Sequence, residues 1–356
     1  MEFTYHDLQF EQVPITMHSS GGTQYTRWVD IGMPKIPVES TNCVFYLYKS
    51  RLDALSGAES GGTGFLVGVS SEKYPHNVVY IYGITNYHVA ISDGYSVIRL
   101  NKQDGSVDVI DYDILEWEWE KGMGDVAISP ILNIDFELHK IIFVPTKMFA
   151  TDQIIEDYKI GVGDDVFMVG RFMNYDGKTT NKPSVRFGNI SLMPVPIKEE
   201  RNRGKGKSYC LDLHSRPGYS GSPVFVYRTI GSDFDSINKQ GAALFDGIYP
   251  FLCLLGIHWG QFPETWEDSR GNYIKGLSGM TCVTPAQRIM DLLNIPNLKK
   301  KREIADMQWE KKFLKEGFPA EPESLSIQKP ISDNPQHKED FTSLLNAATK
   351  KKPQDD

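Results

Sequence analysis

Short runs of β-branched and aromatic residues, separated by Gly, Asp and Asn clusters, follow one another from residue 41 to residue 284. Each run has the length and composition of a β-strand, and the segments between the runs lack the hydrophobic period of about 3.6 residues that marks a helix. The clearest runs are CVFYLYKS, TGFLVGV, NVVYIYGITN, DVAISPI, DDVFMVGRF, SVRFGNISL, SYCLDLH, SPVFVY and FLCLLGIHWG. This pattern predicts an all-β sandwich or barrel rather than alternating strands and helices.

The first clear helix signal comes at the end of this region, in TPAQRIMDLLNI. Thr284 is a suitable N-cap residue, and Pro285 suits the first position of a helix. Ile289, Leu292 and Leu293 would then share one apolar face. We therefore predict a helix that closes the folded body.

The composition changes after Pro296, where the chain becomes rich in charged residues. Residues 299–316 are predicted to form a charged helix, and residues 318–356 are predicted to be disordered. We interpret the helix as a solvated or docked extension. The alternative is an element that binds a partner protein.

Charge and composition restrict the function of the chain. A formal net charge of −8 over 356 residues argues against a nucleic-acid-binding surface, which needs clustered Lys and Arg. No apolar run reaches the roughly 20 residues that span a bilayer, and the first residues lack the pattern of a secretory signal. The four cysteines stand far apart in the chain, which indicates buried reduced thiols. We therefore expect a soluble, cytoplasmic protein that binds neither nucleic acid nor a membrane.

The stretch SRPGYSGSPVF, from Ser215 to Phe225, holds a candidate nucleophile, Ser220. A serine hydroxyl needs a base to take its proton, and it needs backbone N–H donors for the oxyanion that forms during attack. Gly218 permits a turn that points its own N–H and that of Ser220 into one small hole. The competing interpretation is a Gly-rich β-turn with an exposed serine.

His88 and Asp125 are the candidate partners of Ser220. His88 follows the apolar run VVYIYGI, at a point where a cleft between two sheets would expose it. Asp125 precedes the apolar run VAISPI, and a buried carboxylate needs a partner such as an imidazole. The alternatives are a packed or surface histidine and a strand-capping or loop aspartate. The competitors for the role of Asp125 are Asp93, Asp108, Asp111 and Asp113.

In the order His, Asp, Ser, the motifs TNYHVA, GDVAISPI and RPGYSGSPVF resemble the three catalytic motifs of the chymotrypsin-like serine proteases. The resemblance extends to GGTGFLVG before the histidine and to VGDDVFMVGRF and PSVRFGNIS, which are similar to the opening of the second barrel. LLGIHWG is similar to the strand of the specificity pocket, and TCVTPAQRIMDLL to the closing strand and helix. The resemblance covers residues 40–295.

This resemblance implies an all-β, trypsin-like fold of two six-stranded antiparallel β-barrels, with a C-terminal helix and a charged C-terminal extension. Residues 1–40 would be an N-terminal segment, and residues 41–150 would form the first barrel. Residues 151–296 would form the second barrel with the helix, and residues 297–356 a charged, partly disordered tail.

The resemblance also implies a serine endopeptidase that acts on a protein or peptide substrate. Ser220 would attack the scissile carbonyl, and His88 would act first as general base and then as general acid. Asp125 would orient the imidazole, and the N–H groups of Gly218 and Ser220 would form the oxyanion hole. Tyr219 stands where the digestive members have an aspartate that pairs with a new N-terminus. We therefore expect a site that forms constitutively or is switched on by a partner.

The stretch GIHWGQ resembles the specificity strand of the staphylococcal-type glutamyl endopeptidases, and a similar GIH occurs in the 3C-like proteases. The resemblance implies that His258 and Ser215 line the S1 pocket and donate hydrogen bonds to a Glu or Gln side chain at P1. Trp259 and Gly260 would offer backbone to an extended substrate. The alternative is that His258 only packs in the pocket wall.

A different function class stays open: a catalytically silent or partner-activated binding module of trypsin-like fold, with the C-terminal extension docking a regulatory protein. A quality-control protease of the HtrA group usually carries a PDZ domain, and the polar residues after Pro296 are too few to form one. The eight histidines are scattered without metal-ligand spacing, and no phosphate-binding glycine loop occurs. We therefore expect no metal and no cofactor.

Overall fold

The computed structural model describes residues 12–18, 24–30, 36, 38–58, 60–75, 78–173, 177–198, 205–228, 251–267, 271 and 273–316. The chain divides into two units, Met1–Arg302 and Glu303–Asp356. Every strand of the structure and the whole candidate site belong to the first unit.

The first sheet is built from seven short strands whose side chains alternate between two apolar layers. The strands are β3 (Val44–Tyr48), β4 (Ser60–Ser70), β5 (Val79–Thr85), β6 (Val97–Asn101), β7 (Val107–Ile110), β8 (Ala127–Leu132) and β9 (Val144–Pro145). Their hydrogen-bonded order is β7-β6-β3-β4-β5-β8, with β9 in parallel beside β4. Alternation along β3 sends Phe45 and Leu47 into one core cluster and Tyr46 and Tyr48 into another.

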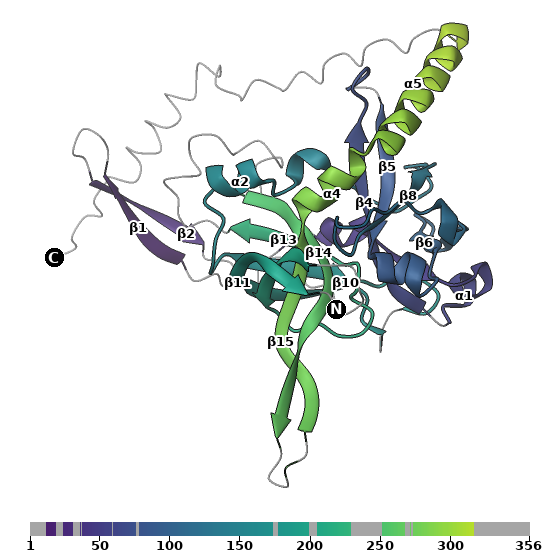
Figure 1. Cartoon of the computed structure of the whole chain (residues 1–356). Coiled ribbons are helices and arrows are strands. Elements are labelled where there is room, and N and C mark those ends of the chain that lie inside the picture. Colours follow the sequence, from purple (N-terminus) through teal and green to yellow (C-terminus); the bar gives the residue numbers. More distant parts are fainter. Residues whose placement is uncertain are drawn as a thin grey trace, which may run out of the picture. The chain divides into compact units, whose positions relative to one another are not determined.

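The second sheet closes on itself as a barrel of six antiparallel strands (Figure 1). The strands are β10 (Asp165–Gly170), β11 (Ser184–Lys198), β12 (Lys205–Asp212), β13 (Pro223–Arg228), β14 (Phe251–Glu267) and β15 (Tyr273–Pro285). They follow the order β10-β11-β12-β15-β14-β13, and pairing of β10 with β13 closes the ring. Buried side chains from every strand fill the interior, including Met168, Ile190, Leu211, Val226 and Leu255.

The predicted fold class is confirmed, because the chain is all-β, with two curled sheets and few helices, in the trypsin-like two-barrel arrangement. Each of the apolar runs identified in the sequence contains a strand. One detail differs from the prediction of two six-stranded barrels. The first sheet has seven strands, and among the described residues the outer edge of β8 pairs with Glu118 at Ile128 rather than with β7. A short connecting segment thus occupies the edge that would close the first barrel.

Helix α4 (Ala286–Leu293) follows β15 where the sequence predicts a helix. Its apolar face is buried as expected, at Ile289, Leu292 and Leu293. The predicted start is wrong, because Pro285 is the N-cap residue and Thr284 belongs to β15, where it pairs with Ile257. Strand pairing holds Thr284 in extended backbone, and the following proline also disfavours the helical conformation at this position.

Helix α5 (Pro296–Glu316) confirms the helix predicted for residues 299–316. At its start, Arg302 donates to the hydroxyl of Tyr82 at 3.3 Å and to the carbonyl of Leu293 at 2.9 Å. The disorder predicted for residues 318–356 concerns residues outside the described part. The remaining elements are β1 (Gln12–His18), β2 (Gln24–Asp30), α1 (Arg51–Ser56), α2 (Asp152–Asp157), η1 (Val38–Cys43), η2 (His88–Ser92), η3 (Ile114–Glu116) and η4 (Thr146–Met148).

The four cysteines are free and buried, as the sequence predicts. Burial raises the pKa of the Cys43 and Cys282 thiols to about 12. A thiol with such a pKa stays protonated at neutral pH and reacts slowly, because the thiolate is the nucleophile. These side chains therefore behave as small apolar core residues.

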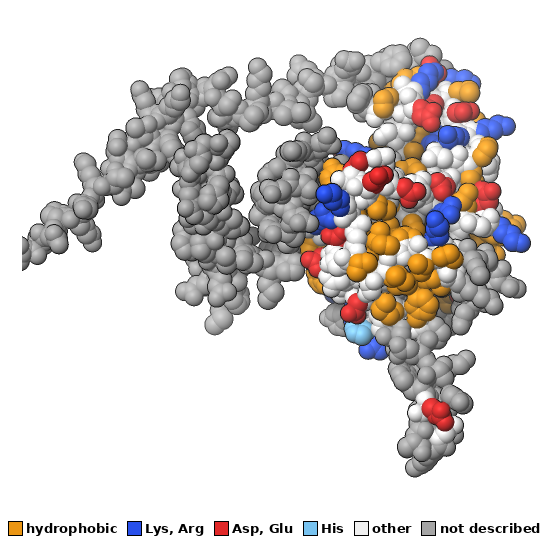
Figure 2. Space-filling view, turned by 60° about the vertical axis from the view of Figure 1, so that its left-hand side comes forward, with side chains coloured by type: hydrophobic (Ala, Val, Ile, Leu, Met, Phe, Trp, Pro, Cys, Tyr) orange, Lys and Arg blue, Asp and Glu red, His pale blue; other side chains and the backbone are white. Residues whose placement is uncertain are grey.

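The exterior carries charges of both signs. On the face drawn in Figure 2, Lys and Arg side chains lie among Asp and Glu side chains, and a group of hydrophobic side chains lies beside them. No helix in the described ranges has the length and apolarity that crossing a membrane requires.

Arg228, the last residue of β13, joins the second barrel to the segment that precedes β10. Its Nε and Nη2 donate to the two carboxylate oxygens of Asp164, each at 2.9 Å. Its Nη1 and Nη2 also donate to the carbonyls of Tyr158 and Lys159, at 2.7 and 3.1 Å. The Arg228 and Asp164 side chains are only 6% and 16% exposed. Loss of the guanidinium would leave a largely buried carboxylate and two carbonyls without these donors.

We expect Arg228→Met to lower the free energy of unfolding by about 2–4 kcal/mol, because a nearly buried charge loses its partner. Urea unfolding at neutral pH measures this change. Arg288→Met is the matched control, since Arg288 contacts Asp291 at 3.4 Å with 38% of its side chain exposed. Its loss should cost less than about 1 kcal/mol. Equal destabilisation in the two variants would contradict this account of Arg228.

Candidate active site

Two paired strands bring His88 and Asp125 together. Antiparallel pairing of β5 with β8 sets Thr85 opposite Ala127, so the residues just after β5 meet those just before β8. His88 Nδ1 lies 2.5 Å from Asp125 Oδ2, and the backbone N–H of His88 donates to Asp125 Oδ1 at 3.0 Å. Both residues are buried, and Asp125 is only 4% exposed. The carboxylate therefore holds both the ring and the backbone of the histidine.

This arrangement determines which nitrogen of His88 can take a proton. A carboxylate accepts hydrogen bonds, so Nδ1 carries the proton of the neutral ring and Nε2 is the basic nitrogen. Asn86 also links the two segments, because its side-chain amide donates to the backbone carbonyl of Asp125 at 2.7 Å. The geometry thus presents a histidine base with a carboxylate in place to stabilise the imidazolium.

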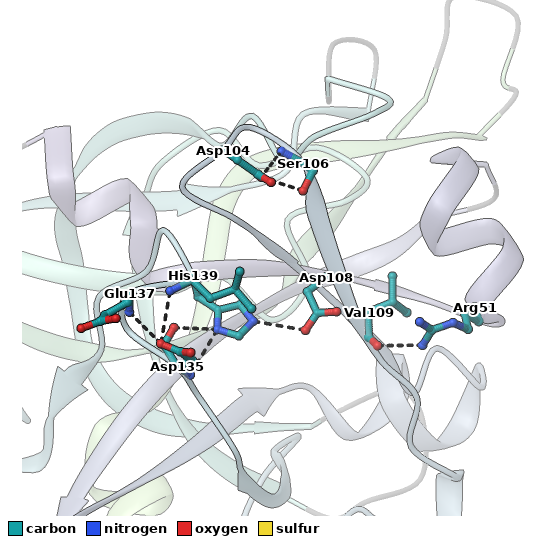
Figure 3. A network of polar contacts seen from close by, with 9 residues as sticks. Arg51, Asp104, Ser106, Asp108, Val109, Asp135, Glu137 and His139 are labelled. Atoms are coloured by element: carbon teal, nitrogen blue, oxygen red, sulfur yellow. Dashed lines mark hydrogen bonds and ion pairs between the residues drawn. The ribbon is translucent and has the colours of Figure 1, made fainter.

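Other aspartates that the sequence allowed as partners of His88 bond to different residues. Figure 3 shows Asp108 beside His139, whose Nε2 lies 3.2 Å from Asp108 Oδ2. Burial raises the pKa of the Asp108 carboxyl, but the hydrogen bond and charge of His139 oppose it and the pKa ends below its ordinary value. Asp113 caps the short turn η3, where its side chain accepts from the N–H of Leu115. Asp125, rather than Asp108 or Asp113, is the carboxylate bonded to His88.

The nucleophile loop (residues 215–222) presents Ser220 between two glycines with left-handed backbone. Gly218 and Gly221 have φ angles of 98° and 86°, which a residue with a side chain rarely adopts. The N–H of Tyr219 donates a hydrogen bond to the carbonyl of Arg216 within the loop, at 3.2 Å. Across the described ranges, the N–H groups of Gly218 and Ser220 donate to no protein acceptor. Both donors are therefore available for an oxygen anion.

The side chain of Tyr219 anchors the nucleophile loop to the wall of the second barrel. Tyr219 is completely buried, and its hydroxyl forms a hydrogen bond with the hydroxyl of Ser184 in β11. Arg186, also in β11, donates from Nε to the same hydroxyl at 3.3 Å, with its guanidinium 5.5 Å from the ring centre. The position of the loop is therefore set by contacts within the second barrel.

The nucleophile loop also contacts strand β4 of the first sheet. The backbone N–H of Thr63 donates to the carbonyl of Ser220 at 2.8 Å. A side chain at the neighbouring Gly62 would place its Cβ 2.6 Å from that same carbonyl oxygen and 2.9 Å from the side chain of Val89. Val89 directly follows His88 in the chain. A single glycine thus touches both the nucleophile loop and the segment that carries the histidine.

The structure brings Ser215 and His258 together as a hydrogen-bonded pair. Ser215 Oγ lies 2.7 Å from His258 Nε2, and both residues are buried, with His258 only 2% exposed. The backbone of His258, in β14, is tied to the nucleophile loop in both directions. Its N–H donates to the carbonyl of Ser222 and its carbonyl accepts from the N–H of Gly221, each at 2.9 Å. The predicted S1 residues therefore share a backbone network with the segment that carries Ser220.

The surroundings of His258 define its protonation state. Its Nδ1 lies 3.3 Å from the carbonyl oxygen of Cys282, which can only accept, so Nδ1 carries the proton. The pKa of His258 is lowered to about 4, mainly by burial, with the hydrogen bond to the Cys282 carbonyl opposing it, the charge of His88 adding to it and the charge of Asp125 opposing it. The ring is therefore neutral at pH 7, and Nε2 accepts a hydrogen bond from the Ser215 hydroxyl.

Trp259 and Gly260 continue β14 beyond the point where its pairing with β13 ends, at Ile257 and Pro223. The indole Nε1 of Trp259 donates to Ser208 Oγ at 3.0 Å, which fixes this side chain against β12. Gly260 has open space where a side chain would lie. Within the described pairing, Gly260 lies opposite Cys282 of β15.

Two contacts of the site have little signal in the sequence. Thr63 stands inside the strand motif GGTGFLVG, and its position between glycines is the one local hint that its backbone approaches another segment. The carbonyl of Cys282 orients His258, but any residue type could supply a backbone carbonyl. Among the residues described, no group of His, Cys, Asp and Glu side chains could hold a metal ion.

Comparison with known proteins adds a set of distant structural likenesses. No family model and no curated protein matches the chain. Among solved structures, the apo MamO protease domain from Magnetospirillum magneticum aligns at 15% identity and a TM-score of 0.41, covering 71% of this chain and 97% of that one. A variant of the HtrA-type protease AlgW with tripeptide aligns at 17% and 0.39, covering 72% and 62%. Deg5 aligns at 14% and 0.39, covering 71% and 88%.

We expect His258 to stay neutral with its proton on Nδ1 until the pH falls to about 4. Because this pKa lies below the unfolded value near 6.5, the stability that the histidine contributes is complete above about pH 6.5 and is lost as the pH falls through the folded value. Long-range ¹H–¹⁵N NMR of the imidazole follows both the tautomer and the titration. A midpoint near 6.5, or a proton on Nε2, would contradict this account.

Proposed function

We propose that the chain is a serine endopeptidase in which Ser220, His88 and Asp125 form the catalytic triad. The observation that carries this proposal is the pair of hydrogen bonds between the Asp125 carboxylate and His88, one to Nδ1 at 2.5 Å and one to the backbone N–H at 3.0 Å. Such a pair orients a base, and the nucleophile loop reaches the same end of the first sheet through Thr63.

The proposed reaction begins when His88 Nε2 takes the proton of the Ser220 hydroxyl as Oγ attacks the carbonyl carbon of the substrate. Negative charge moves to the carbonyl oxygen, where the N–H groups of Gly218 and Ser220 stabilise it. The C–N bond then breaks, and His88 returns its proton to the leaving amine. Water repeats the sequence on the acyl-enzyme and releases Ser220, while Asp125 stabilises the imidazolium in both halves.

The anchoring of Tyr219 supports a site that forms without a newly cleaved N-terminus. The aspartate that pairs with such an N-terminus in digestive relatives is replaced by a buried tyrosine whose hydroxyl bonds Ser184 and Arg186. These bonds come from β11 and are internal to the chain. The loop therefore has its own support in the second barrel.

One observation favours the alternative of a partner-activated or silent binding module. The side chains of Ser215 and His258 bond to each other and are 5% and 2% exposed, so the predicted S1 groups are closed to solvent. A partner or a substrate would have to expose this pair to solvent before a P1 side chain could reach it. Labelling of Ser220 by a fluorophosphonate needs the triad but not an occupied S1 pocket, so labelling without peptide cleavage would identify the closed module and labelling with cleavage the peptidase.

We further propose a cytoplasmic location and a regulatory role for the C-terminal extension. The free, buried state of all four cysteines supports a reducing compartment. The charged helix α5 supports the extension as a docking element. Peptides or proteins would be the substrates.

Cleavage of a fluorogenic peptide library by the wild type and by Ser220→Ala tests the proposed reaction. We expect turnover and fluorophosphonate labelling by the wild type, and a loss of at least about 10⁴-fold in kcat in the variant, because the attacking oxygen is gone. Ser71→Ala, at a buried hydroxyl that accepts from the backbone N–H groups of Lys73 and Tyr74, serves as the control and should keep its activity. Equal turnover by wild type and Ser220→Ala would contradict the assignment of the nucleophile.

For the S1 pocket we propose a preference for Gln over Glu at neutral pH. The pair as it stands offers one free acceptor, Ser215 Oγ, because Nδ1–H of His258 is used on the Cys282 carbonyl and Nε2 accepts the Ser215 proton. A Gln amide can donate to this oxygen, whereas a Glu carboxylate needs an added proton. His258, with its pKa lowered to about 4, supplies that proton only as the pH falls.

We expect kcat/KM for a P1 Gln peptide to exceed that for the matched Glu peptide by at least about tenfold at pH 7.5, and the ratio to shrink as the pH falls toward 5.5. Taking the ratio cancels any pH dependence that the two substrates share. A ratio that is constant with pH, or a preference for Glu at pH 7.5, would contradict the proposed tautomer. A basic or large aromatic P1 residue would exclude the whole S1 assignment.

A further inference from the structure

Thr63 in β4 of the first sheet uses all of its polar groups, and three of its hydrogen bonds reach the second barrel. Its N–H and its Oγ1 donate to the carbonyls of Ser220 and Gly218, each at 2.8 Å. The same hydroxyl accepts from the N–H of Arg171 at 3.0 Å. The carbonyl of Thr63 accepts from Thr85 Oγ1 at 2.7 Å. The residue is completely buried, so water cannot readily replace a lost partner.

The hydrogen bond from the Thr63 hydroxyl to the Gly218 carbonyl holds a critical peptide group of the nucleophile loop. The Gly218 carbonyl and the Tyr219 N–H belong to one peptide group, and the Tyr219 N–H donates to the carbonyl of Arg216 at 3.2 Å. This group lies between the two peptide groups that carry the proposed oxyanion donors. Its orientation therefore sets the direction and spacing of the Gly218 and Ser220 N–H groups. Gly218 itself offers little resistance to rotation, because glycine has access to many backbone conformations.

The Thr63 carbonyl also packs so closely on the nucleophile loop that no side chain fits at Gly221. A Cβ on Gly221 would lie 1.9 Å from the Thr63 carbonyl oxygen and 2.5 Å from Thr85 Oγ1. Thr85 ends β5, the strand that leads to His88. Thr63 thus joins the nucleophile loop of one sheet to the histidine-bearing strand of the other.

We infer that Thr63 is a positioning residue whose hydroxyl holds the Gly218–Tyr219 peptide group in the orientation that the oxyanion hole needs. The inference rests on the proposed function and concerns the same site. Thr63 touches neither the substrate nor the reacting atoms in this role, and it acts through the backbone of the loop. Its hydroxyl should therefore affect the transition state, in which the oxyanion exists, more than substrate binding.

The test compares Thr63→Val, which keeps the shape and removes the hydroxyl, with Thr63→Ser, which keeps the hydroxyl. Thr63→Val should lower kcat by about 10- to 100-fold, less than the 10²- to 10³-fold typical of deleting an oxyanion donor, because both N–H groups remain. KM should change by less than about threefold. Thr63→Ser should recover most of the lost kcat. A peptide aldehyde, which forms a tetrahedral adduct, should lose affinity in step with kcat in Thr63→Val.

Thr151→Val is the matched control, because Thr151 accepts from the N–H of Ile154 at the start of α2 and lies outside the nucleophile loop. Thr151→Val should lower the melting temperature. It should leave unchanged the ratio of the affinity for the peptide aldehyde to the KM for the substrate. If Thr63→Val does not fold, Thr63→Cys gives the same comparison with a weak donor in place of the hydroxyl.

Each outcome separates this inference from the proposed function. A wild-type chain that neither cleaves peptides nor reacts with a fluorophosphonate would overturn the proposed function itself. An active wild type with full kcat in Thr63→Val would overturn the role of the hydroxyl alone. Equal losses in Thr63→Val and Thr63→Ser, or an equal rise in KM and fall in kcat, would assign Thr63 to packing and would also overturn it.

Discussion

The buried carboxylate of Asp125 is the interaction on which the rest of the candidate site depends. A carboxylate removed from water is costly unless its oxygens are hydrogen-bonded, and both oxygens of Asp125 bond to His88. The contact exists because β5 and β8 pair in a register that sets Thr85 against Ala127. Strand register, the turn η2 and the direction of the imidazole are thus linked. A shift in any one of them would break the two hydrogen bonds between the carboxylate and His88.

The second half of the site is organised around the backbone rather than around side-chain charge. Gly221 and Ser222 exchange hydrogen bonds with the backbone of His258, and Thr63 holds the carbonyls of Gly218 and Ser220. Backbone groups of this kind must be paired when buried, so the loop has few alternative conformations. The resulting rigidity would suit the proposed oxyanion hole, whose N–H donors have to be in place before negative charge appears.

The parts of the structure that the sequence predicted are those encoded by neighbouring residues. Alternation in runs such as CVFYLYKS marked the strands, and motifs around His88, Asp125 and Ser220 marked the candidate triad. Contacts between distant segments had no such signal: Thr63 and Gly218 are 155 positions apart. Thr284 was misplaced for a related reason, since its pairing with Ile257 outweighs its local preference for capping a helix. The tautomer of His258 depends on a backbone carbonyl, which every residue has.

The close approach of Gly62 to the Ser220 carbonyl, and of Gly221 to the Thr63 carbonyl, has an evolutionary consequence. Any side chain at either glycine would push the two sheets apart at the point where they share the site. The halves of such a chain are therefore not interchangeable modules. A first half recombined with a foreign second half would need a glycine at both positions, because each one makes room for a carbonyl of the other half.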